Sequence, residues 1–88
     1  MLEKSVEILH AVGLHARPAT IFVQTAGRFV SSIRIEKAGS EVNAKSILSI
    51  LSLGVKQGDV ISICADGVDE MEALTTLIEL VNSNFGEA

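Results

Sequence analysis

Hydrophobic positions in the first third of the chain follow two different periods. At residues 5–9 apolar and polar side chains alternate and place Val6 and Ile8 on one face, which is typical of a half-buried strand. After Ala16 the period lengthens, and one stripe of an amphipathic helix is made of Ala19, Phe22, Val23, Ala26 and Phe29. Gly27 weakens this helix near its end. The pattern therefore predicts a strand followed by a helix.

The middle of the chain returns to alternation. Residues 32–37 place Ile33 and Ile35 inward, the turn at residues 37–40 follows, and a short strand at residues 41–43 completes a predicted hairpin. Residues 46–54 predict a helix of about two turns, with Ser46 as its N-cap and Gly54 just after its end.

The last third begins with an Ile- and Val-rich run at residues 60–65, which predicts a central strand. Asp69 and Glu72 have the spacing of a capping box, in which Asp69 caps the last helix and Glu72 reaches back. The core stripe of that helix is predicted to be Leu74, Leu77, Ile78, Val81 and Phe85. Residues 86–88 are expected to fray.

The resulting order is strand, helix, strand, strand, helix, strand, helix. Strands separated by helices could form a parallel sheet, but the hairpin and the length of 88 residues favour an α+β fold. We expect a four-stranded antiparallel sheet covered on one face by helices, with residues 1–88 forming one domain. Because the chain has only three aromatic residues, its core must be built from Ile, Leu, Val and Ala.

Composition and charge exclude several classes of function. The net charge is −4 and no basic stripe is present, so nucleic acid is not an expected partner. Cys64 is the only cysteine, which excludes an intrachain disulfide and a cysteine-based zinc site, and we expect its thiol to be buried. The first ten residues lack the apolar core of a signal peptide and no run is long enough to span a bilayer, so we expect a cytoplasmic protein without membrane insertion.

The predicted helix at residues 46–54 has more apolar residues than one buried face can hold: Ile47, Leu48, Ile50, Leu51 and Leu53. If Ile50 and Leu53 point inward, some of the other three must face solvent, and such a patch usually marks a partner surface. The alternative is a deeply buried helix.

The candidate chemistry lies in the stretch GLHARPAT at residues 13–20. His15 falls at or beside the N-cap of the first helix, where unpaired N–H groups, including that of Ala16, and the helix dipole favour an anion. Arg17 can grip two phosphoryl oxygens, and Pro18 costs little in the first turn. A neutral imidazole can attack phosphorus, so the group predicts a phosphoryl-accepting histidine, although capping and surface roles are alternatives by spacing alone. His10 is interpreted as a solvated loop histidine.

Four stretches together carry a resemblance to a known family. They are GLHARPAT at residues 13–20, Ala44-Lys-Ser-Ile at 44–47, Leu53-Gly54, and Gly67-Val-Asp-Glu at 67–70. The chain resembles, over nearly its whole length, the histidine-containing phosphocarrier family HPr of the phosphoenolpyruvate-dependent sugar phosphotransferase system. The resemblance implies an open-faced β-sandwich with strand order 1-4-2-3 and three helices on one face.

The resemblance also implies a function. Enzyme I would transfer a phosphoryl group to Nδ1 of His15, Arg17 would stabilise it, Ala16 would offer a backbone N–H, and Pro18 would shape the helix entrance. The chain would pass the group to IIA domains of sugar permeases as a stoichiometric carrier, a monomer rather than an independent enzyme. No metal or organic cofactor is implied.

Further roles follow from the same resemblance. Ser46 corresponds to the serine that an HPr kinase/phosphorylase modifies in many relatives, in some of which a transcriptional regulator is a further partner; elsewhere it is only an N-cap. The expected partner surface consists of Thr20, Gln24, Ile47, Leu48 and Leu51. The chain departs from many Gram-positive relatives in having Leu48 and Leu51 in place of methionines and Ser49 in place of glycine, which leaves partner preference open.

Three other functions are alternatives. A nitrogen-type paralogue would use the same His15 chemistry with a regulatory output and would be recognised by its own Enzyme I. Catabolite-repression paralogues lack the histidine and are disfavoured. An acylphosphatase-like hydrolase would depend on Arg17, with Asn43, but not on His15. A binding module would use the patch around Leu48 alone.

Overall fold

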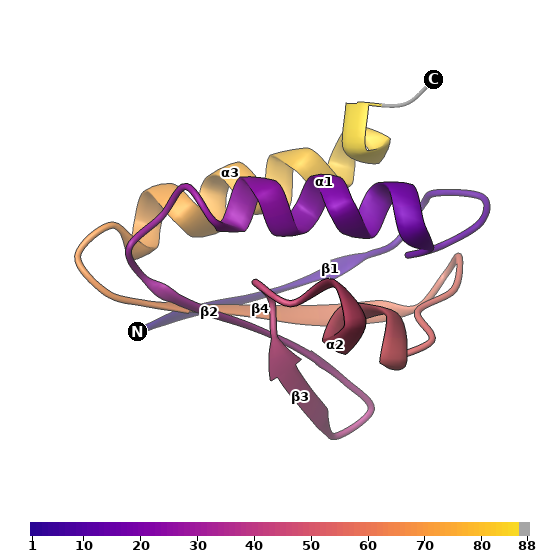
Figure 1. Ribbon diagram of the computed structural model, residues 1–88, viewed down its shortest axis with the longest axis horizontal. Helices are drawn as coiled ribbons and strands as arrows, with labels where there is room; N and C mark the ends of the chain where they lie inside the picture. Colours follow the sequence, from indigo (N-terminus) through magenta and orange to yellow (C-terminus); the bar gives the residue numbers. More distant parts are fainter. Residues whose placement is uncertain (87–88) are drawn as a thin grey trace.

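Strands and helices follow the predicted order along the chain (Figure 1). The computed structural model describes residues 1–86. Its strands are β1 (Leu2–Glu7), β2 (Ser32–Lys37), β3 (Ser40–Asn43) and β4 (Val60–Asp66). Its helices are α1 (Ala16–Ala26), α2 (Ile47–Ser52) and α3 (Glu70–Asn82), followed by a short 3-10 turn, η1 (Asn84–Gly86). The expected α+β class and βαββαβα order are confirmed.

The four strands form one antiparallel sheet in the order β1-β4-β2-β3. β4 lies between β1 and β2, so that Val6 is opposite Ile61 and Ile35 is opposite Ile63. Its position explains its apolar sequence, because a strand with neighbours on both sides and a helix layer above it contributes most to the core. The predicted central strand and the predicted strand order 1-4-2-3 are therefore confirmed.

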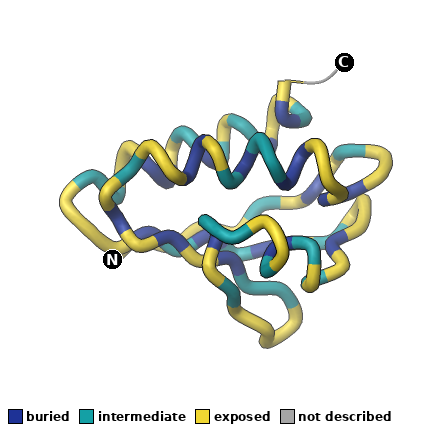
Figure 2. Tube along the Cα trace, in the orientation of Figure 1, coloured by how far each residue is buried: buried dark blue, intermediate teal, exposed yellow. Residues whose placement is uncertain are grey.

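The helices cover one face of the sheet. Figure 1 shows α1 and α3 running side by side above the strands, and α2 packs against α1 and β3. Buried positions of the trace line the space between the two layers (Figure 2). None of the helices within residues 1–86 has the length and apolar character needed to cross a membrane.

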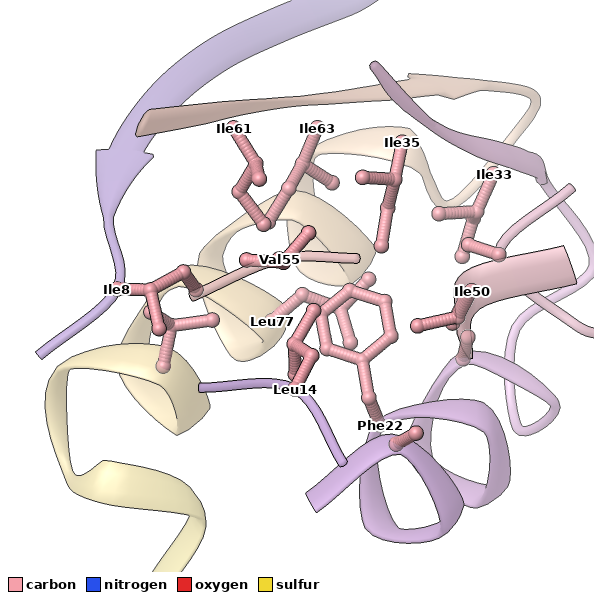
Figure 3. Packing of buried hydrophobic residues seen from close by; sticks show 14 of the residues in the cluster. Ile8, Leu14, Phe22, Ile33, Ile35, Ile50, Val55, Ile61, Ile63 and Leu77 are labelled. Carbon is pink, nitrogen blue, oxygen red and sulfur yellow. The ribbon is translucent and has the colours of Figure 1, made fainter. Parts of the chain in front are cut away.

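The core is aliphatic, as the shortage of aromatic residues required. Alternate residues of β2 and β4 point toward the helices, whose inward side chains complete the core (Figure 3). Burial of each such side chain contributes roughly 1.5–3 kcal/mol. The fully buried residues include Ile33, Ile35, Ile61 and Ile63 from the sheet, with Phe22, Ile50 and Leu77 from α1, α2 and α3.

The ends of three elements, β1, α1 and α3, differ from the prediction. β1 begins three residues earlier than expected, because Leu2 already pairs with Ala65. The residues between Leu2 and Val6 are all polar, so alternation did not extend the predicted strand to Leu2. α1 ends at Ala26, so Phe29 lies beyond it and is only half-buried. Phe85 is buried as predicted, but it stands in η1 with a φ of 59° rather than on α3. Of the three residues expected to fray, 87 and 88 lie outside the described residues.

The predicted capping box at the start of α3 is wrong. Asp69 is the N-cap residue, but its side chain makes no cap bond. Its carboxylate instead accepts hydrogen bonds from the Val30 and Ser31 N–H groups, each at 2.9 Å, and from the Ser31 hydroxyl. Glu70, rather than Glu72, reaches back to accept from the Gly67 N–H at 3.1 Å. A contact 38 positions away in the chain has thus replaced the local cap.

Cys64 is half-buried rather than buried. It sits on β4 opposite Glu3 of β1 and Arg34 of β2, on the face of the sheet away from the helices, where Ile61, Ile63 and the helix layer do not cover it. Partial burial raises the pKa of the thiol, and the nearby Glu3 acts in the same direction. The thiol is therefore not activated as a nucleophile.

Candidate functional site

His15 is the N-cap residue of α1, as predicted. Its backbone is extended, with φ −100° and ψ −167°, and its carbonyl accepts the first intrahelical hydrogen bond from the Ala19 N–H at 2.9 Å. Its side chain makes no cap hydrogen bond and is exposed. The ring therefore stands at the positive end of the helix dipole without serving as the cap itself.

The loop before His15 packs closely against the segment between α2 and β4. The Gly13 N–H donates to the His10 carbonyl at 3.0 Å, and the Leu14 N–H donates to the Val55 carbonyl at 3.0 Å. Gly13 has a φ of +70°, and a Cβ there would lie 2.3 Å from the Val55 oxygen. Leu14 is buried, so the next residue, His15, points to solvent. Close backbone packing thus fixes where the histidine stands.

The first turn of α1 is suited to an anion. Ala16 and Arg17 are exposed, while Pro18 is buried in the third helical position. Proline has no N–H, but that position lacks an intrahelical acceptor in any case. The first turn has no acidic residue, so nothing on it repels a phosphoryl group. The Thr20 hydroxyl donates to the Ala16 carbonyl at 2.7 Å, which ties this turn to the next.

Ser46 is the N-cap of α2, also as predicted. Its side-chain oxygen accepts from the Ser49 N–H at 3.3 Å, and the residue is half-buried. The adjacent Lys45 ammonium donates to the Phe29 carbonyl at 2.8 Å. At the other end of the helix, Lys37 donates to the carbonyls of Leu53 (3.3 Å) and Gly54 (2.9 Å). Lys45 therefore links the segment before the helix to Phe29, and Lys37 binds the carbonyls at its C-terminal end.

The apolar side chains of α2 divide between two environments. Ile50 is fully buried, while Leu48 is 81% exposed and Ile47 is 36% exposed. Leu51 and Leu53 are half-buried and pack against the core. The exposed patch is thus smaller than the three residues considered, because Leu51 faces inward in part. On α1, Gln24 is exposed and Thr20 is half-buried.

Other chemistry is not assembled around His15. Among residues 1–86 no three His, Cys, Asp or Glu side chains are grouped as a metal ion would require. The side-chain oxygen Oδ1 of Asn43 accepts from the Lys45 N–H at 2.9 Å, which closes the turn before α2. A surface depression of about 500 Å³ is lined by residues of the α3 entrance, including Val68, Met71 and Thr75, and contains no residue of the histidine loop.

His10 is the residue that sequence reasoning misjudged. It is half-buried, and its ring centroid lies 5.6 Å from that of His15 and 6.0 Å from that of Phe85. The available signal was the four-residue turn from His10 to Gly13, because a turn of that length brings its first residue back toward the helix entrance. The contact with Phe85 had no such local signal.

The family comparison matches nearly the whole chain. The model described as "PTS HPr component phosphorylation site" matches residues 2–83. The phosphocarrier protein HPr of Neisseria meningitidis is 45% identical over 87 residues, covering 99% of this chain and 98% of the relative. The HPr-like protein Crh of Halalkalibacterium halodurans is 49% identical over 81 residues, covering 92% and 96%.

Solved structures agree with these matches. HPr-C-His from Thermoanaerobacter tengcongensis superimposes with a TM-score of 0.97 at 53% identity, covering 100% of this chain and 99% of that one. A structure titled as an HPr dimer from the same organism gives a TM-score of 0.80 at 54% identity, covering 99% and 100%.

Proposed function

Because the chain belongs to the HPr family of phosphocarrier components of the phosphotransferase system, we propose that it accepts a phosphoryl group from phosphorylated Enzyme I on Nδ1 of His15. It then passes the group to IIA domains of sugar permeases. The observation that carries the proposal is the exposed His15 ring at the N-cap of α1, directly before Arg17.

The transfer requires little rearrangement of the chain. The Nδ1 lone pair attacks phosphorus, the bond from phosphorus to the Enzyme I donor atom breaks, and its electron pair stays with the donor. The proton on the other ring nitrogen of His15 remains there. Onward transfer to a IIA domain repeats the exchange with His15 as the leaving group, so the chain is restored and acts as a stoichiometric carrier rather than an independent enzyme.

Arg17, Ala16 and Pro18 have supporting roles in this proposal. The Arg17 guanidinium pairs with phosphoryl oxygens, and the helix-start N–H groups add to the positive field. Pro18 is buried and fixes the entry of the helix. The first turn of α1 offers no carboxylate that could activate water. A carrier is favoured over a hydrolase of the acylphosphatase kind because Asn43, which that hydrolase would use with Arg17, has its side-chain oxygen engaged by the Lys45 N–H.

Partner docking is assigned to α2 and the adjacent face of α1. Leu48 and Ile47 give an exposed apolar contact, and the partly buried Leu51 adds to it. Thr20 and Gln24 extend this surface along α1. The packing of α1 against α2 supports a single docking surface that includes the histidine.

A regulatory role through Ser46 is the second candidate. The 48% identity to the structure titled Crh, the Bacillus subtilis Catabolite Repression HPr, favours it, as does the N-cap position of Ser46. A phosphate there would be stabilised by the helix N-terminus, while it would add negative charge beside the docking surface. A serine kinase of the HPr kinase/phosphorylase type would be the partner, with a transcriptional regulator as a further one, and the carrier would work in the cytoplasm.

The acceptor step is tested by intact-mass measurement after incubation with phosphoenolpyruvate and a sugar-type Enzyme I. We expect one acid-labile phosphoryl adduct on the wild type. Since the chain has two histidines, His15→Ala should abolish the adduct and His10→Asn should retain it. An adduct that survives in His15→Ala would refute the assignment. Phosphorylation by a nitrogen-type Enzyme I alone would place the chain in that pathway.

We further propose that the carrier is a monomer. A dimer is the specific alternative, because a structure of the T. tengcongensis HPr is titled as a dimer. The test is the molar mass of the chain in solution, measured by light scattering. A mass twice the 9.3 kDa of one chain, independent of dilution, would contradict the monomer.

A further inference from the structure

The residues that join α2 to β4, here called the floor segment (53–59), support the loop that carries the proposed acceptor histidine. At the start of that loop the Ile8 N–H donates to the Asp59 carbonyl at 2.9 Å. At its end the Leu14 N–H donates to the Val55 carbonyl at 3.0 Å. Figure 3 shows the side chains of Ile8, Leu14 and Val55 in the same part of the core. A shift of the floor segment is therefore transmitted to the residue directly before the histidine.

A lysine from outside the floor segment connects its two ends. Lys37, the last residue of β2, donates from its ammonium to the Leu53 carbonyl at 3.3 Å and to the Gly54 carbonyl at 2.9 Å. The same ammonium lies 2.9 Å from Oδ2 of Asp59, at the other end of the segment. These three acceptors match the three N–H donors of an ammonium group. Lys37 therefore holds the first and the last residues of the floor segment together.

The Asp59 carboxylate is suited to this contact. Its Oδ2 also accepts from the Lys56 N–H at 2.8 Å, and this bond and then the Lys37 ammonium lower the pKa of the carboxyl group. The group is therefore ionised near neutral pH. The side chains of Lys37 and Asp59 are 24% and 32% exposed, so the pair is partly shielded from water, and the two carbonyls fix the position of the ammonium.

On the premise of the proposed function, we propose that Lys37 is a positioning residue for phosphoryl transfer to His15: by holding the two ends of the floor segment together, it fixes the Val55 carbonyl against which the histidine loop packs. The donors of Lys37 are directed at the floor segment, so the residue acts on transfer through that segment and touches no reacting atom. A displacement of 1 Å in a reacting group can slow a reaction by about 10²-fold, so a small movement of this support is enough to matter.

The docking surface is held by other contacts. Ile50 is fully buried and Ser46 caps the start of α2, so Leu48 keeps its place when a contact at the far end of the helix is lost. Removal of the Lys37 ammonium should therefore change how fast a docked carrier receives the phosphoryl group, and not how tightly the carrier docks.

The test is single-turnover transfer from phosphorylated Enzyme I to the carrier. Rapid-quench time courses with ³²P at a series of carrier concentrations give a limiting rate and a half-saturating concentration. Lys37→Met keeps the apolar stem and removes the ammonium. The matched control is Arg34→Met on the same strand, which removes the same charge and an ion pair with Glu41 at 2.7 Å, on the face of the sheet away from the helices.

Lys37→Met should lower the limiting rate by about tenfold and leave the half-saturating concentration within about twofold of wild type, whereas Arg34→Met should change neither. Amide hydrogen exchange is a second readout that does not use the phosphoryl reaction. In Lys37→Met the Leu14 N–H should exchange about tenfold faster relative to the Ala44 N–H, which donates to the Ile33 carbonyl. A general loss of stability would accelerate both amides alike.

A limiting rate for Lys37→Met within about twofold of that for Arg34→Met would overturn the proposal, and so would a change confined to the half-saturating concentration. If Lys37→Met does not fold, Asp59→Asn decides the question, because it removes the charge at one end of the floor segment and keeps an acceptor for the Lys56 N–H. Its limiting rate should fall in the same direction, and a rate equal to that of the wild type would overturn the proposal. Absence of transfer to the wild type would refute the proposed function itself, and is distinguishable because the exchange rates do not depend on Enzyme I.

Discussion

Replacing Gly13 by alanine should destabilise the protein and displace His15, whereas the same change at Gly54 should not displace it. Both glycines have a positive φ, +70° and +62°, which costs alanine about 1 kcal/mol. At Gly54 a Cβ would meet nothing within 4 Å, while at Gly13 it would lie 2.3 Å from the Val55 oxygen and 2.8 Å from the Lys56 Cα. Relieving that overlap costs about a further 1–3 kcal/mol.

The assay is thermal unfolding followed by far-UV circular dichroism, together with the rate of phosphorylation by Enzyme I. For a domain of this size 1 kcal/mol corresponds to about 4–8 °C in Tm. Gly54→Ala should therefore lower Tm by about 4–8 °C, and Gly13→Ala by about 10 °C or more. Measured below both transitions, Gly13→Ala should slow phosphorylation by roughly tenfold or more, because small displacements of a reacting group are costly. Equal losses of Tm and equal rates in the two variants would refute the reasoning.

Three further predictions concern other parts of the fold. Hydrogen bonds from Ser31 and then Val30 lower the pKa of Asp69, so its carboxylate contributes stability that is lost as the pH falls through that lowered value. Asp69→Asn should therefore lose less stability than the wild type in melts from pH 7 to 3, while Asp59 and Glu70, whose pKa values are also lowered, keep part of the dependence. Ser46→Asp should stabilise the protein by about 0.3–1 kcal/mol through the helix dipole, and so raise Tm slightly, while it slows phosphorylation by Enzyme I; unchanged kinetics would count against regulation. Leu48→Ala should leave urea unfolding within about 0.5 kcal/mol of wild type but raise the KM of Enzyme I for the carrier, whereas Ile50→Ala, in the same helix, should cost about 2–5 kcal/mol.

Local periodicity was enough to predict the elements, since each buries one face against a single core. Alternation identified β2, the Ile- and Val-rich run identified β4, and the stripe through Phe22 identified α1. The errors arose where distant residues interact. Asp69 binds the backbone before β2 instead of capping α3, and the left-handed turn after α3 carries Phe85 out of the helix and into the core. No local pattern records either contact.

The candidate site likewise has some residues that local sequence predicts and others whose positions depend on contacts between distant parts of the chain. His15, Arg17 and Pro18 are adjacent in sequence and share one helix entrance, so their positions could be predicted from the N-terminal signal of α1. The approach of His10 to His15 depends on the fold of the loop, which Gly13 and the Val55 carbonyl determine together. The partial burial of Leu51 depends on how α2 is rotated against the core. Neither the loop contact nor the rotation has a periodic signal.

A phosphocarrier holds its phosphoryl group without hydrolysing it, and this property separates it from a hydrolase. The most direct test isolates the chain phosphorylated with ³²P from phosphoenolpyruvate, removes Enzyme I, and adds a sugar-specific IIA domain in equal amount. The label should move from the chain to the IIA domain, with little inorganic phosphate released, and His15→Ala should never acquire it. Release of the label as inorganic phosphate at the same rate with and without the IIA domain would contradict the claim.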